Sequence, residues 1–443
     1  MLFRPLARRV ALLLAVCMTL AGCGEGDWFG SPPAAPLKGT RISILPEDTK
    51  LVPDPAAQKV ILPAPEVVPD WPEAGGFPPH AMFHLAIGNN LRKVWTADVG
   101  SGADKRRAFL TQPIAAQGRV FAMDAESVVS AFDLRTGDRL WRTDLAVKDA
   151  DNGSYGGGLA FDRGSLFVTT SFGQIVSLDP RNGKARWKKP LPAPVRGAPT
   201  ARAGRLLVVT VTNATYAFAE EDGHALWSHS GIEEETLLMG GTSPAVSGDT
   251  VVVPYSSGEI FALRIENGAE LWSDTLSVIK RTNEVATLTD IRGLPVIDKG
   301  RVYAASNSDV IAAIDLATGR RLWDHDVGSI ETPWVAGDYL YLITNTPVVA
   351  CLRADTGQVV WTHALQQWDD PEDKTSRIVW TGPVLASDRL IVVSSSGQAL
   401  SLSPYTGRTL GGIDLPDGVT IAPIVADRTL IFVTDAGEMV AYR

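Results

Sequence analysis

The sequence predicts an all-β protein, an eight-bladed β-propeller built from four-stranded antiparallel blades. Two observations count the blades: a turn followed by tryptophan recurs along the chain, and a proline precedes nearly every turn glycine by a constant interval. A third observation predicts that the blades form a closed ring: the first repeat lacks the strands that the last repeat contains, and the last repeat lacks the strand that the first contains. At 443 residues the chain exceeds one ordinary hydrophobic core, and a repeat array accounts for that length.

The recurring turn reads "DLRTGDRLW" at residues 133–141 and returns as "DPRNGKARW", "AEEDGHALW", "RIENGAELW", "DLATGRRLW" and "RADTGQVVW". Thr-Gly, Asn-Gly or Asp-Gly between apolar runs indicates a hairpin, because glycine adopts positive φ without steric cost. A tryptophan stands four residues after each glycine, where we expect its indole to pack between neighbouring blades. These tryptophans are Trp141, Trp187, Trp227, Trp272, Trp323 and Trp361. We expect the same role for Trp95, which lies on a similar strand near the start of the propeller.

The proline marker fixes the length of each three-strand unit. Seven units run 24 residues from their first position to the turn glycine, and that position is proline in all but one, where Leu159 replaces it. Pro423 begins an eighth unit that lacks a tryptophan strand, whereas "LRKVWTADVG" supplies Trp95 on a strand without a preceding unit. Pairing the two completes eight blades over residues 86–443 and leaves no open sheet edge. In the seventh blade Gly411 replaces tryptophan.

All length variation falls in the connectors between each tryptophan and the next proline, which we expect on the face opposite the glycine turns. Two neighbouring connectors are unusual: "SHSGIEEETLLMGGTSP" is both acidic and apolar, and "SDTLSVIKRTNEVATLTDIRGLP" is the longest. Loops on a rigid scaffold commonly carry function, and clustered apolar residues there favour a protein-binding patch. The alternative is that these residues fold back under their own loops.

The beginning of the chain differs in composition. Arg4, Arg8 and Arg9 precede the short apolar run "ALLLAVCMTL", which predicts a signal peptide at residues 1–22. Residues 23–85 are rich in proline and predict an extended tether between a lipid anchor and the folded body. The tether includes "RISIL", for which both a partner and the body remain possible docking places.

Little else in the sequence indicates reactive chemistry. The formal charge of −9 gives no electrostatic reason to bind nucleic acid. Cys351 stands where other blades have a small core residue, "DADNGSYGGG" lacks the later glutamate of a calcium loop, and "HAMFH" offers His80 and His84 without a third ligand. We therefore expect no enzyme, no cofactor, no metal and no small-molecule substrate.

Two resemblances extend these predictions. "LAGC" at residues 20–23 resembles the bacterial lipobox, which implies that Cys23 is acylated, and Gly24 after it implies release to the outer membrane. The repeat "D-L-x-T-G-x-x-L-W" is similar to that of the pyrroloquinoline-quinone-type propellers. Within that superfamily, the lipobox, eight blades and absence of extra domains resemble the propeller lipoproteins of the BAM complex.

This resemblance implies a lipid-anchored scaffold on the periplasmic face of the outer membrane of a Gram-negative bacterium, which binds the periplasmic domains of the barrel-forming partner. The family binds that partner through two adjacent loops, which match "TLLMGGTSP" and "TDIRGLP". The implied contacts are Thr236, Leu237, Leu238, Met239, Asp290 and Arg292. Met239 stands where the family has arginine and Arg292 where it has an acidic residue, so the charge pattern differs.

The alternative within the superfamily is a periplasmic quinoprotein dehydrogenase. That activity requires calcium-binding Glu, Asn and Asp side chains in the central funnel, a catalytic Asp and commonly a pair of adjacent cysteines. The sequence contains no adjacent cysteines.

Overall fold

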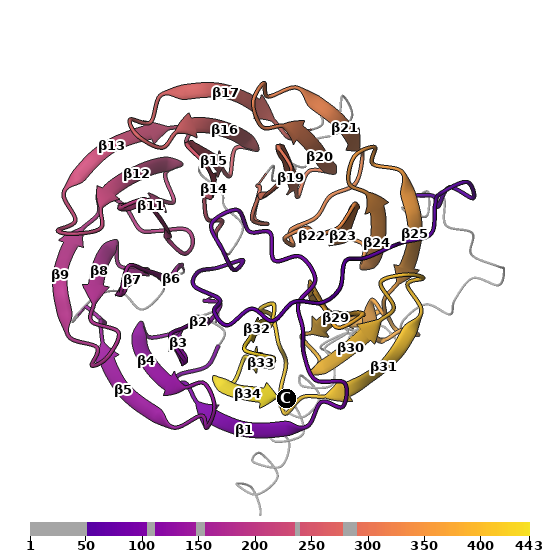
Figure 1. Ribbon diagram of the computed structural model, residues 1–443, viewed down its shortest axis with the longest axis horizontal. Helices are drawn as coiled ribbons and strands as arrows, with labels where there is room; N and C mark the ends of the chain where they lie inside the picture. Colours follow the sequence, from indigo (N-terminus) through magenta and orange to yellow (C-terminus); the bar gives the residue numbers. More distant parts are fainter. Residues whose placement is uncertain (1–50, 104–110, 148–155, 235–239, 278–289) are drawn as a thin grey trace, which may run out of the picture. The chain divides into compact units, whose positions relative to one another are not determined.

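The structure, a computed structural model, describes residues 51–103, 111–147, 156–234, 240–277 and 290–443. Within these ranges the chain forms eight four-stranded antiparallel sheets and one two-stranded hairpin. The sheets stand around a central axis as the blades of a propeller (Figure 1), which confirms the predicted fold class. The described residues contain no helix that is long and apolar enough to cross a membrane.

Each blade runs from an inner strand near the axis to an outer strand at the rim. Blades 1 to 4 comprise β2–β5 (Ile114–Ala116, Arg119–Met123, Val128–Asp133, Arg139–Asp144), β6–β9 (Gly157–Asp162, Ser165–Thr170, Gln174–Leu178, Ala185–Pro190), β10–β13 (Thr200–Arg202, Arg205–Val209, Ala214–Ala219, Ala225–Ser230) and β14–β17 (Ala245–Ser247, Thr250–Pro254, Glu259–Arg264, Glu270–Thr275). Blades 5 to 8 comprise β18–β21 (Val296–Asp298, Arg301–Ser306, Val310–Asp315, Arg321–His325), β22–β25 (Trp334–Ala336, Tyr339–Ile343, Val348–Arg353, Val359–Ala364), β28–β31 (Trp380–Ala386, Arg389–Ser394, Gln398–Leu402, Thr409–Asp414), and β32–β34 (Ile424–Ala426, Thr429–Val433, Glu438–Tyr442) with β1 (Lys93–Asp98).

The ring closes through β1, the first strand of the described residues, which forms the outer strand of blade 8. It pairs antiparallel with β34, with Trp95 opposite Ala441 and Asp98 opposite Glu438. The complementary incomplete repeats of the sequence are therefore one blade. Because both ends of the strand array meet there, no blade is left with a missing strand.

The glycine turns and the tryptophans lock each blade to the next. Each indole Nε1 donates a hydrogen bond, at 2.7–3.1 Å, to a carbonyl that lies three residues before the turn glycine of the following blade. A Cβ on that glycine would lie only 2.4–2.8 Å from a side-chain atom of the blade before it, in most blades the indole ring itself. The glycine thus serves two purposes, since it adopts the positive φ of the turn and leaves room for the indole. The pairs are Trp95–Gly137, Trp141–Gly183, Trp187–Gly223, Trp227–Gly268, Trp272–Gly319, Trp323–Gly357 and Trp361–Gly407.

The exception in blade 7 has a topological reason. An indole at Gly411 would face blade 8, whose outer strand is β1. No turn joins β34 to β1, so blade 8 offers neither the turn glycine nor the carbonyl that receives every other indole. Gly411 therefore stands at the one seam where the recurring contact has no partner.

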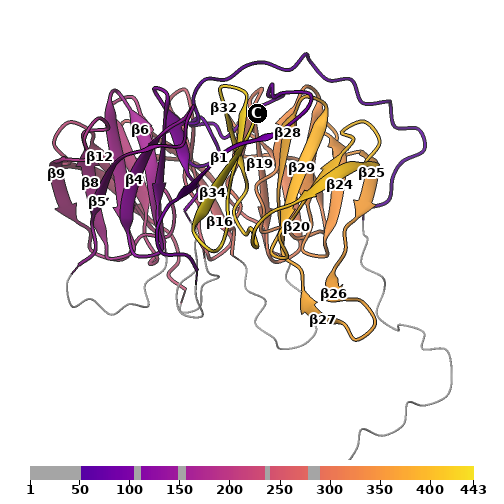
Figure 2. The ribbon, with the colours of Figure 1, turned by 90° about the horizontal axis from the view of Figure 1, so that it is seen from below.

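The N-terminal segment, residues 51–92, crosses one end of the central channel and bonds in turn to the inner strands of blades 1 to 7 and to the turn after the inner strand of blade 8. Figure 2 shows it arching over the ring from blade 6. Its contacts with blades 8 and 1 to 7, in that order, are Val68 with Asp427, Trp71 with Ala115, Pro72 with Phe161, Glu73 with Ala201, Pro78 with Val246, Pro79 with Ile297, Phe83 with Trp334, and Leu85 with Leu385.

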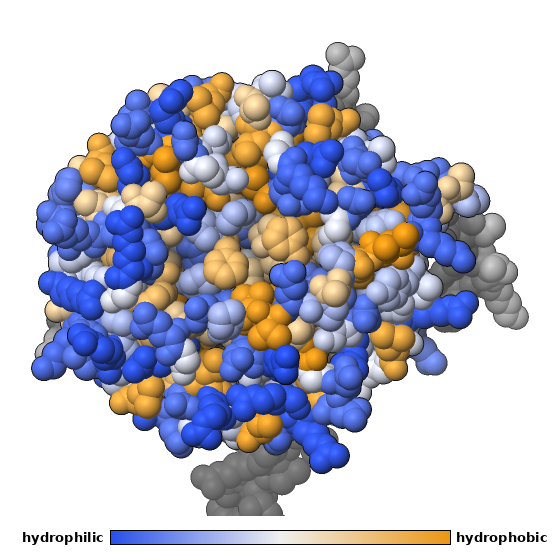
Figure 3. Space-filling view, in the orientation of Figure 1, coloured by the Kyte–Doolittle hydropathy of each residue, from blue (hydrophilic) through white to orange (hydrophobic). Residues whose placement is uncertain are grey.

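Apolar side chains anchor this segment. Leu51 and Trp71 are 3 % and 1 % exposed, and the ring of Trp71 stacks on that of Trp334 with centroids 6.3 Å apart. Others stay at the surface, including Phe77 and Phe83, and Figure 3 shows apolar side chains near the middle of this face. Residues 51–85, which the sequence assigns to an extended tether, are thus extended but packed against the propeller.

The two faces of the ring differ in what they carry. The face crossed by the N-terminal segment also holds the glycine turns, and we call it the turn face. The connectors between blades lie on the opposite face, the connector face, where the hairpin of β26 (Trp368–Asp370) and β27 (Thr375–Arg377) projects (Figure 2). This is the arrangement expected from the sequence.

Candidate functional site

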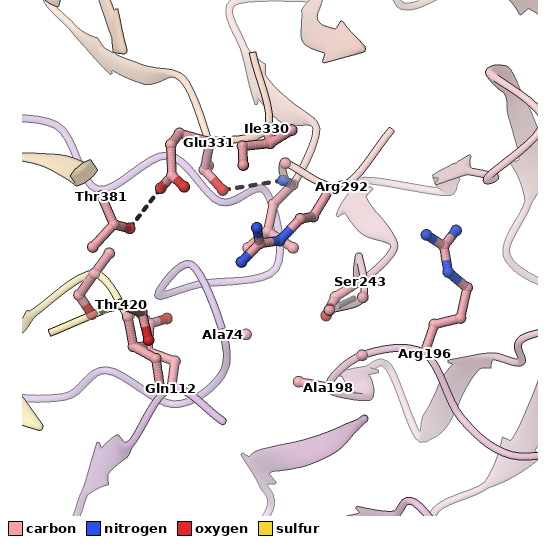
Figure 4. A pocket seen from close by; sticks show the side chains of 18 of the residues that line it. Ala74, Gln112, Arg196, Ala198, Ser243, Arg292, Ile330, Glu331, Thr381 and Thr420 are labelled. Atoms are coloured by element: carbon pink, nitrogen blue, oxygen red, sulfur yellow. Dashed lines mark hydrogen bonds between the residues drawn. The ribbon is translucent and has the colours of Figure 1, made fainter. Parts of the chain in front are cut away.

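The connectors converge on a small cavity in the central channel. Its volume is about 130 Å³, and its lining takes at least one residue from each blade or the connector before it, together with Ala74 of the N-terminal segment. The charged lining residues are Arg196, Arg292 and Glu331. Figure 4 shows the side chain of Arg292 extending into the cavity and that of Arg196 lying to its side.

An ion pair between Arg196 and Asp290 joins two connectors that are separated by a third. The Arg196 Nη2 donates a hydrogen bond to Asp290 Oδ1 at 2.5 Å, and both side chains are at most 2 % exposed. Charges this deeply buried need a partner, because desolvation alone costs each of them several kcal/mol. The pair therefore fixes the end of the longest connector, which precedes blade 5, to the connector before blade 3.

The intervening connector, which precedes blade 4, packs between them through two glycines. A Cβ on Gly241 would lie 1.8 Å from the carbonyl oxygen of Arg196, and one on Gly240 would lie 2.8 Å from the Nε of Arg292. The backbone of this connector therefore touches both neighbours directly. The two loops that the sequence singles out are thus rooted in one packed unit at the channel.

Arg292 and Glu331 carry opposite charges in the channel, and Glu331 is hydrogen-bonded to blade 7. Burial raises the pKa of Glu331, while the positive charge of Arg292 and hydrogen bonds from Thr381 Oγ1 and the Gly382 amide act in the opposite direction. Thr381 Oγ1 donates to Glu331 Oε2 at 2.5 Å (Figure 4). These bonds join the connector before blade 6 to the first strand of blade 7.

The predicted contact residues fall into two groups. Thr236, Leu237, Leu238 and Met239 lie outside the described residues. Asp290 is buried and Arg292 is partly buried in the channel, so neither presents a freely exposed side chain. On the same face Ile232, near the start of the apolar connector, is 61 % exposed.

Sequence reasoning missed Arg196 and Glu331. Arg196 pairs with a residue 94 positions away, and Glu331 bonds to Thr381, 50 positions away. Neither contact can be inferred from the spacing of nearby residues in the sequence. The sequence gives one indication for Arg196. It precedes a glycine in a short connector, which predicts that its long charged side chain lies close to the propeller axis.

The channel does not fit the calcium and quinone of the superfamily. Its 130 Å³ is below the roughly 300–1,000 Å³ of typical small-molecule sites. Glu331 is the only carboxylate in its described lining and is already bonded to Thr381 and Gly382, whereas calcium takes about 6–8 oxygen ligands. Over the described ranges, no group of three or more His, Cys, Asp or Glu side chains is placed to hold a metal ion.

The isolated reactive residues of the sequence occupy structural places. Cys351 is fully buried opposite Trp361, and burial raises the pKa of its thiol. His80 Nδ1 lies 2.8 Å from the Pro295 carbonyl, and burial lowers the pKa of this histidine to about 4. His84 Nδ1 lies 2.7 Å from the Pro63 carbonyl within the N-terminal segment, and its Nε2 accepts a hydrogen bond from the Asp388 amide of blade 7 at 3.0 Å, so both rings help to hold the segment on the propeller.

Comparison with known proteins places this architecture in a family. The family model described as "Outer membrane protein assembly factor BamB" matches residues 92–154, 125–363 and 345–443. A protein of that name from Yersinia pestis is 27 % identical over 356 residues, which span 79 % of this chain and 88 % of the relative.

Solved structures show the same fold in proteins of two kinds. The crystal structure of BamB from Moraxella catarrhalis matches with a TM-score of 0.67 at 19 % identity and covers 80 % of this chain and 100 % of that one. A quinohemoprotein alcohol dehydrogenase from Comamonas testosteroni matches with a TM-score of 0.65 at 14 % identity and covers 84 % and 80 %. At such identities these likenesses concern the fold alone.

Proposed function

This chain belongs to the family of the outer membrane protein assembly factor BamB, and from that premise we propose that it is a non-catalytic scaffold of the machinery that assembles β-barrel proteins in the outer membrane. The observation that carries the proposal is the family match, which extends over the whole propeller from residue 92 to residue 443. We further propose that Cys23 carries the lipid that anchors the protein on the periplasmic face of that membrane.

The binding surface that we propose lies on the connector face, at the connectors before blades 4 and 5. Support comes from their roots, which are packed into one unit by Arg196, Asp290 and Gly241. A rigid root holds a binding loop in one place, which reduces the entropy lost on association. In this proposal Leu237, Leu238 and Met239 contact the periplasmic domains of a barrel-forming partner, while Asp290 positions its loop.

The test is co-purification of the detergent-solubilised protein with an outer-membrane barrel assembly protein. We expect Leu238→Asp to abolish it and Ile232→Asp, on the same connector, to weaken it, because a charge in an apolar contact costs binding free energy. Ile61→Asp is the matched control, since Ile61 is 78 % exposed on the turn face. Recovery of the wild-type protein without a partner, or equal loss in the Ile61 variant, would refute the proposal.

The dehydrogenase alternative depends on likeness of fold. It predicts dye-linked alcohol oxidation once quinone and Ca²⁺ are added to the purified protein. We expect no such oxidation, because the channel fits neither component. A quinone-dependent rate that is lost on mutation of Glu331 would favour the enzyme.

A further inference from the structure

The seam between blades 7 and 8 lacks the indole that fills every other seam. In blade 1 Trp141 lies opposite Ala131, and in blade 7 Gly411 lies opposite Ser401 in the same register. A Cβ built on Gly411 would meet no heavy atom within 4 Å. The position where an indole would begin is therefore open space.

This space is an apolar groove of about 200 Å³. Ile391 and Leu400 of blade 7 line one side, Leu430 and Phe432 of blade 8 line the other, and Leu91 lies at its edge. For comparison, an engineered apolar cavity of about 150 Å³ binds benzene. The groove is thus large enough for an aromatic side chain, and apolar side chains of both blades line it, although it lacks the turn glycine and acceptor carbonyl of the occupied seams.

The structure itself shows which group suits such a seam. In blade 1 the ring of Trp141 packs against that of Phe121, with centroids 5.9 Å apart. Ile391 is the third residue of its strand, as Phe121 is of its own, and lines the groove from the equivalent place. Seven indoles inside this molecule are therefore the template for what the eighth seam accepts.

Two further features indicate a polypeptide. Ring closure completes every blade, but the outer strand of each blade still ends its sheet, and β31 is exposed at all six residues, so its outer edge can pair with an extended segment of another chain. Arg389 is the one charged residue among the described lining residues, and it donates hydrogen bonds to the carbonyls of Gly88 and Asn89. An acidic residue beside the inserted ring would complement its charge.

We propose that the groove at the seam between blades 7 and 8 binds an aromatic side chain, carried by an extended acidic segment of a partner polypeptide. The segment lies along β31 and inserts its ring where the other blades hold tryptophan. This site is at the rim of the propeller and does not depend on the function proposed for the connector face.

The chemistry of the groove is tested with N-acetyl-tryptophanamide as the probe and N-acetyl-leucinamide as the comparison. Methyl NMR of the whole protein should show ring-current shifts at Ile391 and Leu430 with the tryptophan probe. Gly411→Trp should weaken that binding at least tenfold by filling the groove, and Gly411→Leu provides a second, smaller filling. Leu140→Trp, at the exposed position before Trp141, is the control and should leave binding unchanged.

Absence of shifts, equal binding of the leucine probe, or binding retained by both Gly411 variants would overturn the assignment. The occupant is tested with a photo-crosslinking residue at Ile413, which is 40 % exposed beside the groove. The expected adduct maps by mass spectrometry to an acidic segment with an aromatic residue in another polypeptide and disappears in Gly411→Trp. An adduct with a second copy of this chain, or none, refutes the proposed partner.

The two proposals fail in distinguishable ways. Leu238→Asp should remove co-purification and leave the Ile413 adduct in place. Gly411→Trp should remove the adduct and leave co-purification unchanged if the two surfaces bind independently. Loss of both in either variant, with the fold intact by circular dichroism, contradicts the independence of the rim site.

Discussion

The contact between turn glycine and indole makes a quantitative prediction that can be tested within one blade. Gly319 and Gly300 both belong to turns of blade 5 and have φ of 72° and 73°. A Cβ on Gly319 would lie 2.7 Å from the Cγ of Trp272, whereas one on Gly300 would meet nothing within 4 Å. Alanine at the two positions therefore adds the same backbone strain, but only Gly319→Ala adds a clash.

The expected magnitudes follow from these two terms. A residue with a Cβ in the left-handed region costs about 1–2 kcal/mol, which is the whole expected effect of Gly300→Ala. Overpacking adds about 1–3 kcal/mol, so that Gly319→Ala should lower the free energy of unfolding by about 2–5 kcal/mol. Trp272 cannot easily move away, because it is 8 % exposed and its Nε1 is bonded to the Leu316 carbonyl at 2.7 Å.

Guanidinium unfolding followed by far-UV circular dichroism measures both effects without relying on tryptophan fluorescence. In a Trp272→Gly background, which also removes the Trp272 Cβ that would lie 2.8 Å from the added methyl group, the clash is absent, and Gly319→Ala should then cost no more than Gly300→Ala does. Equal unfolding midpoints for Gly319→Ala and Gly300→Ala in the wild-type background would refute the argument. In that case the glycine would be required by φ alone.

Three further predictions concern buried groups. Arg196→Met should lower the unfolding free energy by about 3–5 kcal/mol because it removes the guanidinium that pairs with the buried Asp290 carboxylate, and Asp290→Asn added to it should restore part of the loss, as guanidinium unfolding will show. Burial raises the pKa of Glu73 well above its usual 4.5, so the native state keeps its proton where the unfolded state loses it, and wild-type stability falls as pH rises above about 4.5. Glu73→Gln should therefore gain in melting temperature over the wild type between pH 5 and pH 9, and a constant difference would contradict this sign. Trp71→Ala should cost about 3–5 kcal/mol if the N-terminal segment is part of the folded body, and an unchanged unfolding midpoint would show that the segment detaches.

The propeller was predictable because its determinants are local and repeated. Within nearly every repeat the tryptophan follows the turn glycine by four residues, and the proline that begins the first strand precedes that glycine by 24 residues. Repetition turned a strong local hairpin signal into a count of blades, and the incomplete ends identified the pairing of β1 with β34. The reason for Gly411 was not predictable in the same way, because it depends on a turn that the neighbouring blade lacks.

The N-terminal segment and the channel were harder to predict for a physical reason. Proline-rich composition predicts extended chain but does not say whether that chain packs, and Leu51, Trp71 and Met82 follow no period that would indicate a buried face. Most of the segment's bonds to the blades use backbone groups, which leave no trace in the sequence. The Arg196–Asp290 pair is likewise a contact between distant connectors, visible only once the blades are placed.

The residues that stabilise the propeller are distinct from the connectors, which vary in length and composition. Each indole contact joins an outer strand to the glycine turn of the next blade and involves no connector, so connectors can change in length and composition without loosening a seam. Substitutions at exposed connector residues should therefore alter binding at constant stability, and those at turn glycines should do the reverse. The Arg196–Asp290 pair should affect both stability and binding, because its residues belong to connectors yet are buried at the channel. Arg196→Met should accordingly reduce both the unfolding free energy and co-purification, and a variant that lost stability but kept full co-purification would show that the roots of these connectors do not position the binding loops.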